Sequence, residues 1–278
     1  MADSAAQTQY RDELVAAFEE GMSWLRQTTV TEAVIKGNVA SFLVAGSGGA
    51  TAVTRGLNGM IPARADDLTQ SSATLTEWHD LVRKTRFNVF QSQGDQRRLM
   101  QETTRKVLNR RIDADIIAEL DTATNNAGAA ATASLALVMK ALTKLGNAEV
   151  PVEEEDKMWA VVTPAFMAYL EELPEFSSVD YVEVKPMAGP MRRVRRWKGV
   201  NWIKHPNLTG VGTNSEKCYL YHQDAVGSAF DSGEGLNTAI GYNDEQDYSY
   251  ARASSFTGAK LLQQSGIIQL LHDGSAYA

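Results

Sequence analysis

The sequence predicts an α+β fold, and two observations support this prediction. Residues 159–164 form a compact apolar run of strand length, followed directly by a short helical pattern over 165–173. A long polar stretch over 50–90 has the alternation and β-branching of strands and leads into one long, charged helix. Strands and helices that follow one another at such short spacing are typical of an α+β domain.

Composition supports a folded core and narrows the class of function. The chain has 278 residues, is 44% hydrophobic and carries a net charge of −7. This acidic balance argues against a dedicated nucleic-acid-binding protein, which normally has a basic excess. The single cysteine, Cys218, excludes an intrachain disulfide. The first residues lack the features of a secretory signal, and no apolar run approaches the roughly 18 residues of a membrane-spanning helix, so we expect a soluble chain made in a cytoplasm.

The N-terminal segments predict a helix and then a strand. Residues 8–26 place apolar side chains at helical spacing, which indicates either a core helix or an arm that docks on a neighbouring copy. Residues 38–46 predict a short strand. The glycines of 46–50 predict a turn, because no lysine followed by serine or threonine comes after them, as a phosphate-binding loop would require.

The polar stretch predicts strands at 50–55, 67–77 and 81–90. A ribbon with two polar faces leaves strand edges exposed, and such edges favour association with another chain. We therefore interpret this stretch as an arm that packs on other copies, and the chain as an assembly protein.

Residues 95–122 predict the long helix. Leu108, Ile112, Ile116 and Leu120 recur every four residues and predict a buried stripe. The basic residues on its outer faces could contact nucleic acid, but a solvated face paired with acidic neighbours is the favoured interpretation. A second helix is predicted over 133–146, with Gly146 as its end.

The most basic run lies in residues 192–202, where tryptophans alternate with arginines. It could form a platform for single-stranded nucleic acid. The favoured alternative is a strand with its arginines pointing outward into salt bridges with another subunit. Residues 217–230 predict a strand and a helical turn, 231–247 a loop, and the segment after 249 two strands or a short helix and a strand.

Catalytic patterns are missing. None of the four histidines (His79, His205, His222 and His272) has a partner at metal-binding spacing. Cys218 lies in a predicted strand and is interpreted as a buried structural thiol. Nothing assembles a nucleophile, a base and an oxyanion donor. We predict no catalytic residue, no cofactor, no metal and no enzyme activity.

The order of these elements resembles that of the major capsid proteins of tailed bacteriophages with the Hong Kong 97-type fold. Residues 81–120 are similar to the end of that family's extended loop and its spine helix. Residues 159–170 and 249–271 are similar to its later strand–helix pair and its closing strands. The resemblance covers most of the chain, although each single motif is diffuse.

The resemblance implies an α+β chain with five parts. They are an N-terminal arm (1–29), an extended β loop region (30–94), the spine helix with the first part of the peripheral domain (95–151), the axial domain (152–241) and a return to the peripheral domain (242–278).

The implied function is structural: self-assembly as pentamers and hexamers into an icosahedral shell around double-stranded phage DNA. The implied partners are other copies of the chain, a portal protein, a decoration protein and DNA bound without sequence specificity, with no membrane. A separate scaffolding protein is expected because no long scaffolding segment precedes the arm. The expected location is the virion, after assembly in the host bacterial cytoplasm, and no Lys–Asn cross-link is expected.

Charged residues of the arm-like and basic segments are the candidate intersubunit contacts. They are Arg55, Arg64, Asp66, Asp67, Arg83, Arg86, Arg97, Arg98, Arg192, Arg193, Arg195 and Arg196. Three alternatives remain: an encapsulin-like compartment shell, a small soluble nucleotide-binding enzyme that uses the glycine turn, and a nucleic-acid binder that uses residues 192–202.

Overall fold

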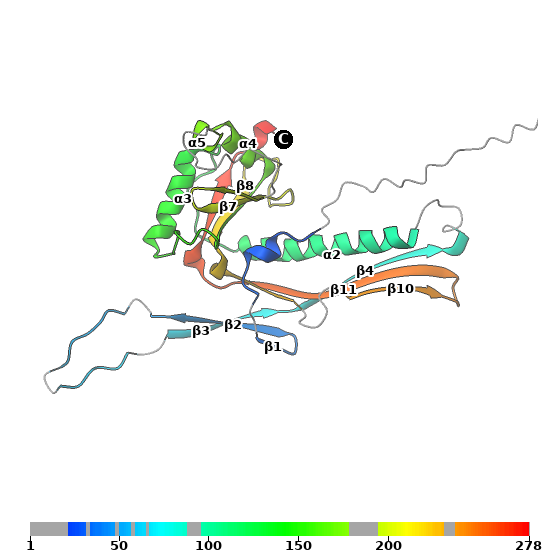
Figure 1. The fold of residues 1–278 in the computed structure, drawn as a ribbon, viewed down its shortest axis with the longest axis horizontal. Coiled ribbons are helices and arrows are strands. Elements are labelled where there is room, and N and C mark those ends of the chain that lie inside the picture. The colour runs from blue at the N-terminus through cyan, green and yellow to red at the C-terminus, as the bar shows by residue number, and fades with distance from the viewer. Residues whose placement is uncertain are drawn as a thin grey trace, which may run out of the picture. The chain divides into compact units, whose positions relative to one another are not determined.

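The structure is a computed structural model that describes residues 22–31, 34–47, 50–56, 59–64, 67–87, 96–177, 194–230 and 237–277 (Figure 1). The chain divides into two compact units. Among the described residues, the first unit comprises 22–24, 76–87, 96–113, 230 and 237–257. The second comprises the described residues of 25–75, 114–229 and 258–277.

The first unit contains an antiparallel sheet in the order β10 (Asn237–Asn243), β11 (Tyr248–Leu261) and β4 (Thr76–Thr85). β11 pairs with the whole of β4, from Tyr248 opposite Thr85 to Thr257 opposite Thr76. The loop predicted at 231–247 is therefore wrong over 237–243, which is a strand. The strand predicted at 81–90 ends at Thr85, and residues 86–87 are helical.

Helix α2 (Gln96–Leu120) confirms the predicted long helix and its buried stripe. Leu108, Ile112, Ile116 and Leu120 are all buried. Within the first unit, the Arg111 guanidinium of α2 lies 3.7 Å from the centroid of the Trp78 ring on β4. This cation–π contact joins the helix to the sheet.

The second unit is built on a five-stranded sheet with the order β12 (Ile267–His272), β8 (Glu216–His222), β5 (Met158–Val162), β7 (Val200–Lys204) and β6 (Val194–Trp197). β5 and β7 are parallel, and the other pairs are antiparallel. Helix α4 (Pro164–Glu172) follows β5 as predicted. Its N-cap is Thr163, whose hydroxyl accepts a hydrogen bond from the Phe166 amide, and Pro164 occupies its first turn.

Helices α3 (Leu135–Asn147), α4 and α5 (Pro174–Ser177) contribute to the main hydrophobic core together with this sheet. Leu145, Phe166 and Trp202 are among its fully buried side chains. The predicted stop at Gly146 is wrong, because α3 continues to Asn147 and the left-handed residue after it is Glu149, with φ of 57°.

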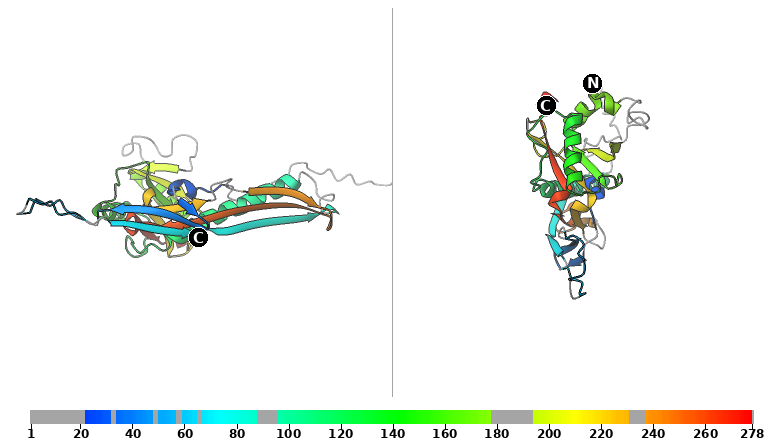
Figure 2. Two further views of the ribbon diagram at one scale, coloured as in Figure 1. Left: turned by 90° about the horizontal axis from the view of Figure 1, so that it is seen from below. Right: turned by 90° about the vertical axis from the view of Figure 1, so that its left-hand side faces the viewer.

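A second sheet in this unit has the order β1 (Val34–Lys36), β2 (Val39–Gly46) and β3 (Asp67–Thr74). Figures 1 and 2 show β2 and β3 side by side in a long two-stranded arm. The strand predicted at 50–55 is wrong, since 50–56 have no regular structure. We call residues 39–47, 50–56, 59–64 and 67–74 the ribbon.

The remaining elements are short. They are the 3-10 turns η1 (Leu25–Thr28), η2 (Gln223–Ala225), η3 (Gln264–Gly266) and η4 (Ser275–Tyr277), and strand β9 (Val226–Phe230). Most of the helix predicted at 8–26 lies outside the described residues. In the described part of the chain, no helix is long and apolar enough to cross a membrane.

Candidate assembly surfaces

The ribbon has one buried end and one exposed end. Near its root, Ala40, Phe42 and Ala73 are buried with Ala229 of β9 in a small hydrophobic cluster. Leu43 and Leu68, farther out, are 68% and 53% exposed. Leu43 and Phe42 are neighbours along β2, so their side chains point to opposite faces of the ribbon. The apolar face that carries Leu43 is therefore not the face that holds the ribbon on its own chain.

The tip of the ribbon exposes further apolar side chains. Met60 is 75% exposed and Ile61 is 66% exposed. The candidate contacts Arg55 and Arg64 lie in this segment and are also exposed. Apolar side chains gathered on an arm and flanked by charge are typical of a surface that another protein covers.

The first unit exposes a second mixed surface, on one face of its sheet. Leu81 on β4 is directly opposite Arg252 on β11, and Phe256 is opposite Glu77. All four side chains are exposed. The candidate contact Arg83 lies on the same face, with its guanidinium 5.0 Å from the centroid of the Tyr248 ring. Arg86 follows β4 and is exposed.

Both candidate arginines of β6 are engaged within their own chain. Arg195 on β6 has a side chain that is only 6% exposed, and it forms an ion pair with Glu171 of α4. Arg196 on the same strand pairs with Asp156 at 2.6 Å and donates to Glu155. The expectation that every arginine of this strand points outward is therefore wrong for Arg195, because the acid that it contacts comes from a helix packed on the sheet.

The basic run also turns where a single strand was expected. β6 and β7 form a hairpin whose two turn residues, Lys198 and Gly199, have φ values of 53° and 72°. Positive φ at both positions is typical of the type I′ turns that connect adjacent antiparallel strands.

The other candidates divide into two groups. Arg98 on α2 pairs with Glu102 one turn later, at 2.9 Å. Asp66, Arg192 and Arg193 lie outside the described residues, as do the side chains of Asp67 and Arg97.

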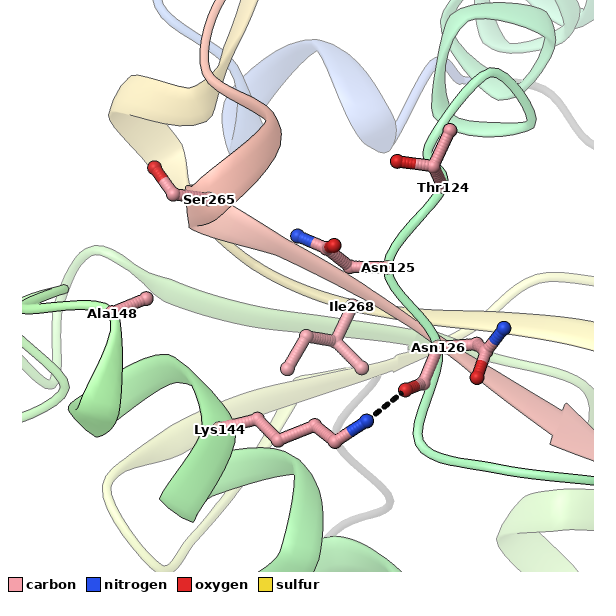
Figure 3. Close-up of a pocket in the computed structure, with 7 residues that line it drawn as sticks. All are labelled: Thr124, Asn125, Asn126, Lys144, Ala148, Ser265 and Ile268. Atoms are coloured by element: carbon pink, nitrogen blue, oxygen red, sulfur yellow. Dashed lines mark hydrogen bonds between the residues drawn. The ribbon is translucent and has the colours of Figure 1, made fainter.

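A shallow pocket in the second unit has a volume of about 420 Å³ (Figure 3). Its lining comes from the segment after α2, from α3 and its C-cap, from η3 and from β12, and consists of Thr124, Asn125, Asn126, Lys144, Ala148, Ser265 and Ile268. Lys144 already donates to the Asn126 carbonyl at 2.6 Å, and Asn125 donates to the Gln264 carbonyl at 2.7 Å. These contacts fix the segment that follows α2. The residues that line the pocket include no pair of an acid and a base.

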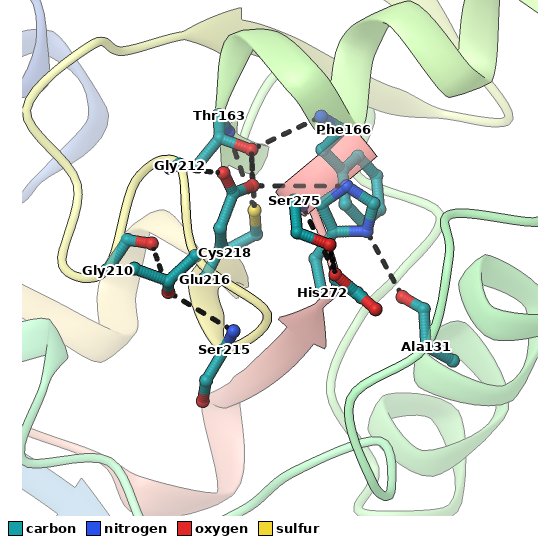
Figure 4. Close-up of polar contacts among 12 residues, drawn as sticks. Ala131, Thr163, Phe166, Gly210, Gly212, Ser215, Glu216, Cys218, His272 and Ser275 are labelled. Atoms are coloured by element: carbon teal, nitrogen blue, oxygen red, sulfur yellow. Dashed lines mark hydrogen bonds and ion pairs between the residues drawn. The ribbon is translucent and has the colours of Figure 1, made fainter. Parts of the chain in front are cut away.

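The buried polar residues of this unit form a structural cluster (Figure 4). The Glu216 carboxylate accepts hydrogen bonds from the Thr163 hydroxyl at 2.5 Å and from the Gly212 amide at 2.8 Å. His272 Nε2 lies 3.9 Å from that carboxylate, and its Nδ1 donates to the Ala131 carbonyl. Burial raises the pKa of the Cys218 thiol to about 12, so Cys218 is a protonated structural thiol, as the sequence predicted.

Among the described residues, no group of histidine, cysteine, aspartate or glutamate side chains is arranged to hold a metal ion.

Sequence reasoning selected the charged residues of the ribbon and missed its exposed apolar ones, above all Leu43, Leu68, Met60 and Ile61. The available signal was large apolar side chains within a polar, turn-rich stretch, at positions that alternation alone could not assign to a core.

Comparison with known proteins agrees with this architecture. The model of a phage capsid protein family matches residues 2–274. No curated protein matches the chain. A solved structure from Mycobacterium phage Che8 is 16% identical, with a TM-score of 0.72 over 97% of this chain and 98% of that one.

Two further capsids have similar folds. The capsid of cyanophage P-SCSP1u is 14% identical, with a TM-score of 0.69 over 96% of this chain and 93% of that one. The capsid of Ralstonia phage GP4 is 13% identical, with a TM-score of 0.69 over 98% of this chain and 96% of that one. The family match, the long helix beside strand β4 and the two-stranded ribbon lead to one conclusion: the chain belongs to the phage capsid protein family and is a structural, non-enzymatic protein with the Hong Kong 97-type fold of tailed-phage major capsid proteins.

Proposed function

We propose that copies of this chain assemble as pentamers and hexamers into a closed icosahedral head that encloses double-stranded phage DNA. The ribbon is the observation that carries the proposal. It is anchored on its own chain at Phe42 and exposes Leu43 and Leu68 beyond that point. Burial of such side chains against a neighbouring copy contributes roughly 1.5–3 kcal/mol each.

The acidic chain suits an inner wall that holds DNA without binding it tightly, because like charges repel at short range. The expected partners are a separate scaffolding protein, a portal protein, a decoration protein and the packaged DNA. As a capsid protein, the chain is located in the virion. We propose that it assembles in the host bacterial cytoplasm. The exposed candidate contacts, Arg55, Arg64, Arg83 and Arg86, belong to the same proposal as intersubunit contacts.

Electron microscopy and light scattering of the purified chain, alone and with its candidate scaffold, test the proposal. Closed shells, or rings of five and six copies, are the expected result. A uniform monomer or dimer under both conditions would contradict it. Shells that copurify with an enzyme cargo, and not with DNA and portal, would favour the encapsulin-like compartment.

A pair of variants tests the role of the ribbon in this assembly. Leu43→Asp places a charge on the exposed ribbon and is expected to abolish closed shells while leaving the unfolding midpoint of the soluble chain unchanged. Met139→Asp is the matched control, because Met139 is an exposed apolar residue of α3, at 44% exposure, outside the ribbon. Equal loss of shells in both variants would show that the ribbon has no special role.

A further inference from the structure

Two glycines contact the root of the ribbon. A Cβ atom at Gly227 of β9 would lie 2.7–2.9 Å from carbons of the Phe42 ring. A Cβ atom at Gly258 of β11 would lie 2.8 Å from the Thr74 carbonyl oxygen. Neither glycine has a positive φ. Close packing, and not backbone conformation, therefore disfavours a side chain at both positions, because a Cβ atom would force its neighbours to shift.

The two contacts fall on different strands of the ribbon. Gly227 meets β2 through Phe42, and Gly258 meets the end of β3 at Thr74. We call these four residues the ribbon seat. The segments that carry the two glycines are joined by a hydrogen bond from the Leu262 amide to the Ala225 carbonyl, at 2.8 Å. Each strand of the ribbon is thus held by the same small platform.

Beyond Phe42 on β2 and Ala73 on β3, no side chain in the described part of the ribbon is fully buried: residues 43–47, 50–56, 59–64 and 68–72 are exposed or half-buried. The direction of the ribbon is therefore set at its root. A strand extends about 3.3 Å per residue, so a tilt of about 10° at the root moves a point ten residues away by about 6 Å. A displacement of that size exceeds the range of a side-chain contact.

We propose that the ribbon seat is a positioning device for assembly: close packing of Phe42 on Gly227 and of Thr74 on Gly258 aims the ribbon at the neighbouring copy. The seat rests on the proposed function, because it matters only if ribbons join copies. Every copy in a shell carries the same seat, so a small error at the seat is multiplied through the particle.

The test compares alanine substitutions at the seat with a matched glycine elsewhere. Gly227→Ala and Gly258→Ala insert a methyl group into close packing, which forces its neighbours to move. Gly146→Ala is the control, because at this helical glycine no heavy atom of the described chain, apart from its chain neighbours and the nearby backbone of its own helix, lies within 4 Å of the Cβ position. The readouts are the diameter and yield of closed particles by electron microscopy, and the unfolding midpoint of the unassembled chain.

The expected result is a loss of about tenfold in closed particles of wild-type diameter for both seat variants, with open or irregular products in their place. Gly146→Ala is expected to assemble normally. On a Phe42→Leu background, where the ring is gone, Gly227→Ala should cause a smaller additional loss, because the two changes share one contact.

Particles of normal diameter and yield from both seat variants would overturn the inference, as would an equal loss from Gly146→Ala. If the alanine variants do not fold, Phe42→Leu decides, because it loosens the seat without a clash, and unaltered particles from it would overturn the inference. Failure of the wild-type chain to form any shell would instead contradict the proposed function.

Discussion

At the scale of single residues, the interior of the second unit contains a histidine ring nitrogen that carries no proton. His272 Nδ1 donates to the Ala131 carbonyl, so the proton of the neutral ring is on Nδ1. His272 Nε2 then faces the Glu216 carboxylate at 3.9 Å and has no hydrogen-bond partner among the described residues. Burial lowers the pKa of His272 below its ordinary value of 6.5, although the Ala131 carbonyl and the charges of Glu216 and Asp273 oppose this effect.

This lowered pKa predicts a loss of stability in acid. As the pH falls below 6.5, the unfolded chain takes up a proton at His272 that the folded chain does not. The contribution of His272 to the free energy of unfolding is therefore fully present above pH 6.5. As the pH falls, this contribution decreases until the pH is below the lowered pKa of the folded state. Urea unfolding midpoints from neutral pH to about pH 5 measure it. His272→Gln keeps a donor for Ala131 and does not titrate, so it should show a smaller loss; an unchanged pH dependence would contradict the prediction.

At the scale of elements, the end of α2 is held by one carboxylate. Asp121, directly after the helix, accepts hydrogen bonds from Tyr219 of β8 and from Thr209, and pairs with Lys217 at 3.1 Å. Burial raises the pKa of Asp121, but the bonds from Thr209, Tyr219 and Lys217 outweigh it, so the net pKa is lowered. A negative charge at a helix C-terminus is unfavourable by itself, and these partners compensate for it.

Asp121→Ala is expected to lower the free energy of unfolding by roughly 2 kcal/mol, because the Asp121 side chain is only 25% exposed and its partners lose their acceptor. Asp156→Ala is the matched control: that side chain is 90% exposed, so removal of its pair with Arg196 should change the free energy by less than about 0.5 kcal/mol. Urea unfolding of both variants measures the difference, and equal losses would show that Asp121 is not a special anchor.

The elements also show which local patterns were reliable. The stripe of Leu108, Ile112, Ile116 and Leu120 and the β5–α4 pair follow from spacing within one segment. Strand β10 was not predicted, because its residues alternate weakly and its stability depends on pairing with β11. The position of Arg195 was not predicted either, since Glu171 lies on a different element.

At the scale of the whole molecule, the two units carry separate surfaces for assembly. The ribbon belongs to the second unit, and the exposed face with Leu81, Arg83 and Phe256 belongs to the first. A shell protein needs several such surfaces, because each copy has several neighbours, and weak contacts become strong only in combination.

Charge reversal at Arg83 tests the surface of the first unit. Arg83→Glu removes the cation–π contact with Tyr248, which costs the fold about 0.5–1 kcal/mol at an exposed site. The yield of closed particles should fall far more than this small change in folding implies. Soluble yield and particle counts from the same preparation measure the two effects, with Lys140→Glu, an exposed site on α3, as control. Proportional losses of both yields would contradict an assembly role.

The sequence by itself determined the α+β class, the long helix with its buried stripe, the strand–helix pair after residue 158 and the order of elements that resembles a phage capsid protein. These features depend on the periodicity of apolar residues along one segment, which is a local property. Only the tertiary structure decided which arginine turns inward, where the ribbon is anchored, and that Gly227 and Gly258 pack closely against the ribbon. Those features depend on side chains that meet across distant parts of the chain, and no local pattern records such partners.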